Sequence, residues 1–251
     1  MEDLEFKEFA ARIVAESEKQ GAMLRLLGAV AFNVHCPQFG YMQAKAERHF
    51  TDLDFAAYYS HNVAIRKTFE HLGFIEDRET AVVYARSRLV FGDPKTLLHV
   101  DIFFDKLDFC HPIPWTGRLE VDSPTIPLAE LILEKMQIVQ LNQKDVIDTI
   151  MLVREHHMDA SDEETINAQR IAGMCAKDWG LWRTVTMNLR RVVEIGRGYQ
   201  WLPEADRIVV EERIAGLLST IDAEPKGFAW KARHKIGDRV KWYKDVSEIQ
   251  Q

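Results

Sequence analysis

The chain has few cysteines and no long apolar run. Only three cysteines occur among 251 residues, Cys36, Cys110 and Cys175, and this odd, sparse set excludes a disulfide framework and predicts reduced thiols. No uninterrupted apolar stretch approaches the roughly 20 residues that a membrane-spanning helix needs. The first five residues lack the basic and apolar regions of a signal peptide. We therefore expect a cytoplasmic protein without a membrane segment.

A net positive charge is also missing. The formal charge of −7 at pH 7 argues against a general binder of polyanions, because such proteins normally present a basic surface. The acidity lies in the N-terminal part, since residues 160–251 carry 15 Lys and Arg against 14 Asp and Glu. Length and composition are those of a globular protein of one or two domains. We expect two, over residues 1–159 and 160–251.

Apolar spacing and turn residues predict both helices and strands. Helices are expected over about 4–19, 28–37, 60–72, 127–139 and 145–153, and strands over 23–27, 51–55, 88–91 and 98–104. Residues 161–218 are helix-rich. Ser60 is the expected N-cap of one helix, and Ser161 with Glu164 forms a capping-box signal for another. The sequence thus predicts an α+β fold, in which a mixed sheet with flanking helices is followed by a helical C-terminal unit.

Acidic residues occupy two of the expected strands. Asp52 and Asp54 are two residues apart, so both side chains point to the same face of a strand, and Asp101 is expected on a neighbouring strand. Three carboxylates of this kind can hold divalent cations, and the small-residue turn at Gly28 can approach phosphates through backbone amides. Together these features predict metal-dependent phosphoryl or nucleotidyl transfer. The alternative is a chance Asp-x-Asp motif on a solvated strand edge.

Two adjacent Cys and His pairs suggest another metal site. His35 with Cys36 and Cys110 with His111 offer four ligands of the types that zinc prefers. Neighbouring residues on a strand point to opposite faces, so both members of a pair rarely reach one ion. We favour buried packing for Cys36 and Cys110.

Five short segments together resemble a known family. They are Leu27-Gly28-Ala29, Asp52-Leu53-Asp54, Asp101, Glu134-Lys135-Met136 and Lys144-Asp145-Val146-Ile147-Asp148. Over roughly residues 20–155 the chain resembles the nucleotidyltransferase superfold with DNA polymerase beta-like topology, especially its AbiEii-type branch of bacterial nucleotidyltransferases and toxins. The resemblance implies that the mixed sheet is nucleotidyltransferase-like.

The resemblance also implies roles for the site residues. Asp52 and Asp54 would coordinate Mg²⁺, with Mn²⁺ as the alternative, and Asp101 would join them and activate the acceptor hydroxyl. Gly28 and Ala29 would approach the triphosphate of an NTP. The superfold usually has Gly or Ser where this chain has Ala29, so a hydroxyl contact is lost while the backbone amide remains.

Four further residues would bind the nucleotide. Lys135 would neutralise phosphate charge, and Asp145 and Asp148 would position the nucleotide or hold helices together, the alternative being exposed charges on an amphipathic helix. The polar insertion over residues 36–48 carries Arg48, which would reach phosphate or pair with a nearby carboxylate.

The leading hypothesis is an enzyme, a nucleotidyltransferase that moves NMP from an NTP to a hydroxyl of RNA, a protein or a small molecule such as an aminoglycoside. The tail over residues 226–244 has seven Lys and Arg interleaved with Trp230, Trp242 and Tyr243, a pattern typical of nucleic-acid binding. It favours a toxin that acts on tRNA and is controlled by an antitoxin protein. The alternatives are a catalytically silent nucleotide-binding or protein-interaction module of the same fold, and a protein whose helical C-terminal part binds a partner.

Overall fold

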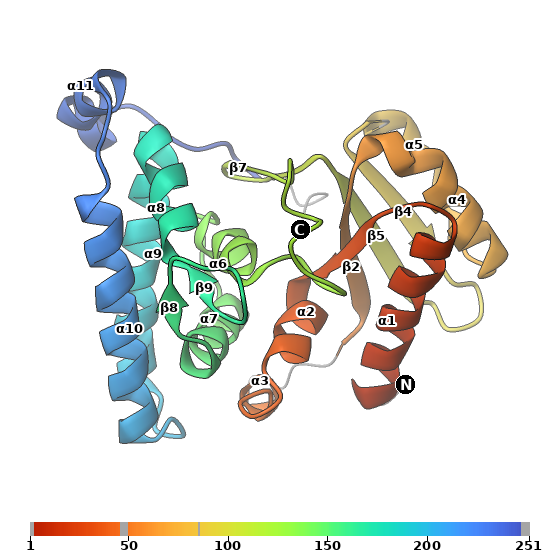
Figure 1. Cartoon of the computed structure of the whole chain (residues 1–251), viewed down its shortest axis with the longest axis horizontal. Helices are drawn as coiled ribbons and strands as arrows, with labels where there is room; N and C mark the ends of the chain where they lie inside the picture. The colour runs from red at the N-terminus through yellow and green to blue at the C-terminus, as the bar shows by residue number, and fades with distance from the viewer. Residues whose placement is uncertain (1–2, 46–49, 85, 247–251) are drawn as a thin grey trace. The chain divides into compact units, whose positions relative to one another are not determined.

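The computed structural model describes residues 3–45, 50–84 and 86–246, which form two compact units (Figure 1). The first comprises residues 1–37, 47–107 and 113–127, and the second comprises residues 38–46, 108–112 and 128–251. None of the described helices is both long and apolar enough to cross a membrane. The prediction of an α+β protein with a mixed sheet is confirmed.

The first unit holds the large sheet and the helices around it. Its elements are α1 (Asp3–Lys19), β1 (Leu24–Leu27), α2 (Gly28–His35), β2 (Asp52–Ala57), η1 (Tyr59–His61), α4 (Asn62–His71), β3 (Ile75–Glu76), α5 (Arg78–Tyr84), β4 (Arg88–Gly92) and β5 (His99–Phe104). A two-stranded sheet of β6 (Lys106–Asp108) and β7 (Pro112–Pro114) follows.

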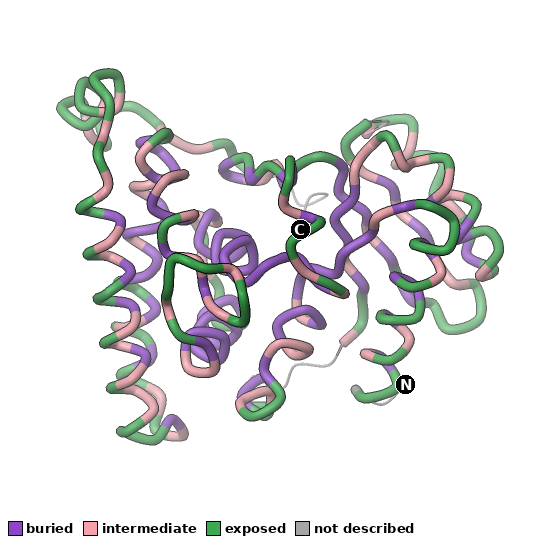
Figure 2. Tube along the Cα trace, in the orientation of Figure 1, coloured by how far each residue is buried: buried purple, intermediate pink, exposed green. Residues whose placement is uncertain are grey.

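The five strands of the large sheet are ordered β1-β2-β5-β4-β3, and only β2 and β5 are parallel neighbours. One face of the sheet is apolar. Phe55 and Phe91 point to it, and Phe69 of α4 lies across both, with ring centroids 6.3 Å and 4.6 Å away. Helix α1 packs on β1 and on α4 (Figure 1), and the apolar residues of the central strands are buried (Figure 2). Polar side chains are therefore left to the opposite face.

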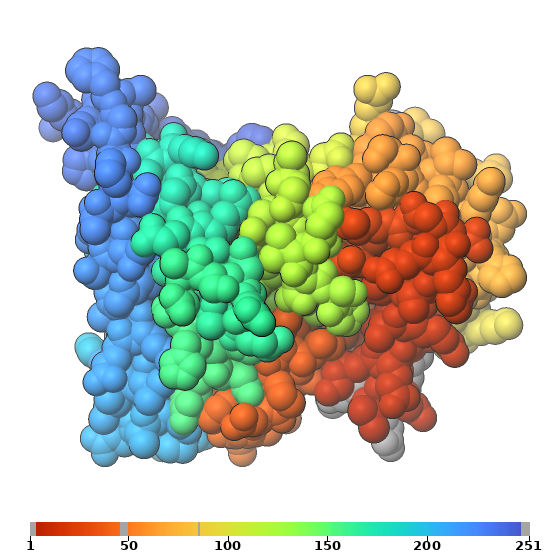
Figure 3. All heavy atoms as spheres, in the orientation of Figure 1, coloured from red at the N-terminus to blue at the C-terminus, as the bar shows by residue number. Residues whose placement is uncertain are grey.

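The second unit is largely helical. Its elements are α3 (Tyr41–Ala44), α6 (Leu128–Met136), α7 (Gln143–Glu155), β8 (Met158–Asp159), β9 (Ile166–Asn167), α8 (Ala168–Lys177), α9 (Trp179–Gly198), α10 (Glu204–Ala223), α11 (Phe228–Ile236) and η2 (Gly237–Arg239). Apolar side chains of α7, α9 and α10, among them Ile150, Leu189 and Leu217, are fully buried between the helices. In the space-filling view α10 and the segment leading to α11 form a continuous surface of this unit (Figure 3).

Two predicted helix starts are wrong. Ser60 lies in η1, and α4 begins two residues later at Asn62 without a side-chain cap. Ser161 and Glu164 precede β9 rather than a helix, because the Ser161 hydroxyl accepts the Glu163 N–H in a local turn and Glu164 has a φ of 54°. The cap is supplied instead by Asn167, whose side chain accepts the Arg170 N–H at 2.9 Å.

The compact units divide the chain elsewhere than the expected boundary at residue 159. Helices α6 and α7 lie in the second unit because they pack on α8, α9 and α10. Part of the polar insertion joins them, since the N–H groups of Gln38 and Phe39 donate to the Glu155 carboxylate. Segments that adjoin strands of the sheet in the sequence therefore belong to the helical unit.

Candidate functional site

The polar face of the sheet carries the three predicted carboxylates. Asp52 and Asp54 lie on β2, and Asp101 lies on β5. The parallel register pairs Asp54 with Asp101 and Asp52 with His99. Because paired residues on neighbouring strands point the same way, the side chains of Asp54 and Asp101 leave the sheet side by side. Asp52 shares their face at the exposed start of β2.

The glycine turn lies against one of these carboxylates. Gly28 joins β1 to α2 with a φ of +70°, a conformation that side chains with a Cβ rarely adopt. A Cβ built on Gly28 would lie 2.4 Å from Oδ2 of Asp54. Asp54 therefore approaches the N-terminus of α2, where backbone dipoles favour negative charge, and Ala29 follows within the first turn.

Arg88 of β4 was not among the residues predicted from the sequence. Its Nε and Nη2 donate to Oδ1 and Oδ2 of Asp101 at 2.7 Å and 3.0 Å, and both side chains are largely buried. The guanidinium also lies over the ring of Phe103. Burial opposes a charged guanidinium, but the hydrogen bond and charge of Asp101 and the charge of Asp54 outweigh it, so the pKa of Arg88 is raised. A permanent cation thus lies on the acidic face, the face of the sheet that carries Asp52, Asp54 and Asp101.

The carboxylates of this face are of the ligand type that divalent cations prefer. Carboxylate oxygens are the ligands that Mg²⁺ prefers, and Asp52, Asp54 and Asp101 would hold it. Within residues 3–45, 50–84 and 86–246, however, no three His, Cys, Asp or Glu side chains form a group that could hold a metal ion. The bidentate contact with Arg88 engages both carboxylate oxygens of Asp101. The guanidinium occupies the position of a counter-cation.

Three further predicted residues meet in the second unit. Nζ of Lys135 lies 3.3 Å from Oε1 of Glu134, 3.3 Å from Oδ1 of Asp145 and 3.5 Å from Oδ2 of Asp148. All four side chains are buried, so the alternative reading of Asp145 and Asp148 as exposed charges is wrong. Gln43 of α3 donates a hydrogen bond to the other oxygen of Asp148 at 2.9 Å.

This cluster joins three helices. Asp145 also completes the capping box of α7, in which the Asn142 side chain accepts the Asp145 N–H and the Asp145 carboxylate accepts the Asn142 N–H. Asp145 and Asp148 therefore hold α6, α7 and α3 together, one of the two roles expected for them. Their contact with a nucleotide, and that of Lys135, stay predictions. Arg48 lies outside the described residues.

The aromatic residues of the basic tail pack against the helical unit. The indole N–H of Trp230 donates to the carbonyl of Cys175, and its ring meets Trp182 edge-on at 5.0 Å. The indole N–H of Trp242 donates to the hydroxyl of Thr184 at 3.0 Å. Both tryptophans are thus engaged within the unit, which reduces the surface that they offer to bases.

The two Cys and His pairs have separate partners. Nε2 of His35 lies 2.5 Å from the Thr125 hydroxyl, and Nε2 of His111 lies 2.8 Å from the Thr184 hydroxyl. Cys36 and Cys110 are buried and belong to no disulfide bond, as expected.

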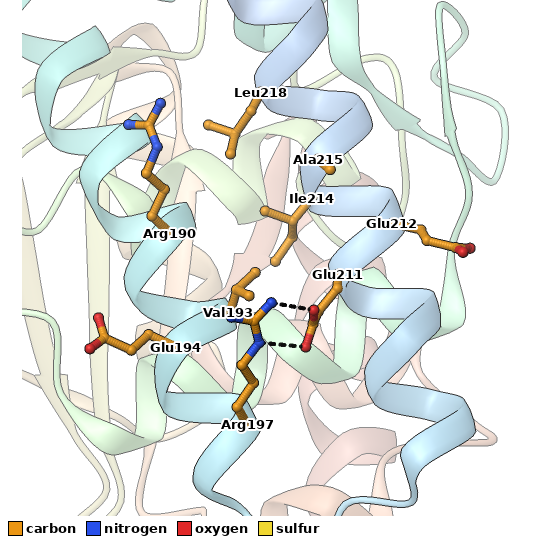
Figure 4. Close-up of a pocket in the computed structure, with 9 residues that line it drawn as sticks. All are labelled: Arg190, Val193, Glu194, Arg197, Glu211, Glu212, Ile214, Ala215 and Leu218. Carbon is orange, nitrogen blue, oxygen red and sulfur yellow. Dashed lines mark hydrogen bonds and ion pairs between the residues drawn. The ribbon is translucent and has the colours of Figure 1, made fainter.

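A groove lies between α9 and α10 in the second unit (Figure 4). It has a volume of about 500 Å³, and its lining comes from these two helices: Arg190, Val193, Glu194, Arg197, Glu211, Glu212, Ile214, Ala215 and Leu218. Arg197 spans it by a bidentate contact with Glu211 at 2.9 Å and 2.6 Å. The predicted chemistry therefore lies elsewhere than in this groove.

No protein-family model matches this chain, and no curated protein matches it.

Proposed function

We propose that the protein is a Mg²⁺-dependent nucleotidyltransferase, which transfers NMP from an NTP to a hydroxyl acceptor and releases pyrophosphate. The observation that carries the proposal is the pairing of Asp54 with Asp101 on parallel strands, with the Cβ-free Gly28 against Asp54. An acidic pair beside a glycine turn at a helix start is suited to a metal-bound triphosphate. The proposal includes a nucleotidyltransferase-like arrangement of the mixed sheet.

Each residue has a task in this proposal. Asp52, Asp54 and Asp101 would hold the metal, which supplies charge stabilisation for the attacking and leaving oxygens of an in-line displacement. Backbone amides at Gly28 and Ala29 would face the phosphates. Asp101 accepts the proton of the acceptor hydroxyl, which then attacks the α-phosphorus as pyrophosphate leaves.

Transfer of label from α-³²P NTPs in the presence of Mg²⁺ and cell extract tests the proposal. Asp54→Asn and Asp101→Asn should each lower transfer at least about a hundredfold, because a lost metal ligand removes several kcal/mol of transition-state stabilisation. Asp222→Asn, at an exposed position of α10, is the control and should retain activity. Unchanged transfer in Asp54→Asn would contradict the mechanism.

A catalytically silent nucleotide-binding module is the second candidate. Ala29 favours it, because the hydroxyl of a serine, one of the two residues usual at this position in the superfold that the sequence resembles, is missing. The contact of Asp101 with Arg88 favours it as well, since both carboxylate oxygens already have donors. Calorimetric titration with Mg²⁺ and each NTP separates the candidates: binding without release of pyrophosphate identifies the silent module.

The acceptor is left open among RNA, a protein and a small molecule. Three cations of the tail, Lys231, Lys235 and Arg239, are exposed and are available to a phosphate backbone. The fraction that takes up label in the transfer experiment identifies the acceptor, and label in tRNA would support a toxin with an antitoxin partner.

A further inference from the structure

Arg88 places one positive charge beside the proposed metal ligands. Its guanidinium contacts both oxygens of Asp101 and lies close enough to Asp54 for the two charges to interact. The side chain of Arg88 is only 12% exposed, so solvent screens its charge incompletely. Any ligand of this face must therefore meet the guanidinium as well as the carboxylates.

The sign of that interaction depends on the ligand. A bare divalent ion carries two positive charges and is repelled by the guanidinium at short range. A divalent ion bound to a nucleoside triphosphate arrives with a net negative charge. The positive charge of the guanidinium attracts that complex.

We propose that Arg88 is a specificity-determining residue, which disfavours a divalent cation alone and favours the same cation bound to a triphosphate. The inference rests on the proposed function, because it concerns the same acidic face. It assigns to Arg88 a task beyond the structural one of joining β4 to β5. The bidentate contact with Asp101 holds the guanidinium where both effects operate.

A purely structural Arg88 predicts a different result. Removal of a structural arginine would loosen Asp101 and weaken the binding of every ligand at this face. The proposed role of Arg88 in specificity, here called the selector role, predicts affinity changes of opposite sign. When the charge is removed, the bare metal should bind more tightly and the metal–nucleotide complex more weakly. These opposite signs are the signature to be measured.

The experiment compares the native protein with Arg88→Gln, Arg88→Lys and a matched control, Arg66→Gln. Arg66 forms a comparable bidentate contact in the same unit, with Glu76 at 3.0 Å and 3.1 Å, and joins α4 to β3. Binding of Mn²⁺ alone is followed by electron paramagnetic resonance. Binding of Mg²⁺ with the four α,β-methylene NTP analogues is followed by calorimetry, and thermal unfolding reports the fold of each variant.

Arg88→Gln should bind Mn²⁺ alone roughly tenfold more tightly and the Mg²⁺–nucleotide complex roughly tenfold more weakly. Arg88→Lys keeps the charge and should leave the affinity for Mn²⁺ alone within about twofold, while Arg66→Gln should change neither affinity. Affinity changes of the same sign in Arg88→Gln, or no change, would overturn the selector. If Arg88→Gln does not fold, a change in Mn²⁺ affinity in Arg88→Lys beyond about twofold overturns it.

The failure of the proposed function has its own signature. A folded native protein that binds none of the Mg²⁺–nucleotide complexes would refute nucleotidyl transfer, and the selector with it. A native protein that binds such a complex, together with an Arg88→Gln variant that binds it equally well, would refute the selector alone.

Discussion

At the scale of single residues, the close approach of Gly28 and Asp54 limits where the Asp54 carboxylate can lie. Gly28 has no Cβ, and the space that a Cβ would fill is taken by the carboxylate of Asp54. A larger residue would have to adopt an unfavourable φ and also displace Asp54. The same residue thus combines a conformational requirement with a steric one.

Gly28→Ala tests this combination against Gly73→Ala. Gly73 also has a positive φ, of 86°, but its added Cβ would meet nothing within 4 Å. We expect Gly73→Ala to lower the free energy of unfolding by about 1 kcal/mol and Gly28→Ala by about 2 kcal/mol or more. Urea denaturation measures both. Equal losses would show that the approach to Asp54 does not constrain the turn.

His111 is a second residue whose surroundings have a measurable consequence. It is buried beside Thr184 and faces Asp178 and Lys244, and burial lowers its pKa below the ordinary value. The folded state therefore favours the neutral ring, whereas the unfolded state takes up a proton as the pH falls below about 6.5. The stabilisation is present above that pH and is lost as the pH falls toward the folded pKa.

His111→Gln should therefore flatten the dependence of stability on pH. Between about pH 6.5 and 5 the native protein should lose up to about 1.4 kcal/mol per pH unit more than this variant. Urea denaturation at pH 7.5 and pH 5.5 gives the difference. His71→Gln, at an exposed helix end, is the control, and an identical pH dependence in native protein and His111→Gln would refute the assignment.

At the scale of elements, Lys135 contacts three carboxylates of the second unit and thereby links the helices that carry them. Lys135 of α6 lies between Glu134, Asp145 and Asp148, and its removal would leave buried like charges without a cation. Such a cluster is costly to break because the remaining charges cannot reach water. We therefore expect the lysine to stabilise the packing of α6 on α7.

Lys135→Met should lower the free energy of unfolding by about 3 kcal/mol or more. The matched variant Lys19→Met removes an exposed lysine from a contact with Glu16 and should show no resolvable change. Urea denaturation of both variants gives the comparison. A small loss in Lys135→Met would indicate that the carboxylates are hydrated or protonated in the folded protein.

The strands show how far the sequence alone predicts the site. The two-residue period places Asp52 and Asp54 on one face, and the pairing of Asp54 with Asp101 agrees with the expectation that the third carboxylate lies on a neighbouring strand. Arg88 begins a predicted strand in which the buried Leu89 and Phe91 alternate with its other residues. The face of the sheet to which Arg88 points could therefore be predicted. Its partner was not, because the register of β4 against β5 is a tertiary property.

Helix starts were predicted less well for a related reason. Ser161 and Asn167 both offer side-chain acceptors within a few residues of α8, and local patterns do not decide between them. In the structure α8 starts at Ala168 after the Asn167 cap, and it buries Ile171, Ala172 and Cys175. Local sequence patterns also do not assign α3 to a unit. It belongs to the second unit because it contacts α7.

At the scale of the whole molecule, the chain passes repeatedly from one compact unit to the other. Residues 38–46 and 108–112 belong to the second unit although the first unit lies on both sides of them in the sequence. A cut at residue 159 therefore passes through the second unit and removes the helices on which α6 and α7 pack. The expected boundary at residue 159 thus differs from the division into compact units.

Truncation after residue 159 should unfold α6 and α7 while the sheet of the first unit persists. Hydrogen exchange followed by mass spectrometry should show loss of protection over residues 128–155 by at least about tenfold and retained protection over 52–57 and 99–104. The full-length chain provides the reference exchange rates. Protected amides in α7 of the truncated chain would show that residues 1–159 suffice to fold it.

This interleaving also bears on inheritance. A single genetic crossover can exchange a domain cleanly only if one position separates all of its residues from those of its neighbour. No single position does so here, since each unit is assembled from segments that alternate along the chain. Chimeras with relatives would therefore need several coordinated junctions, and the two units are expected to be transmitted together rather than shuffled.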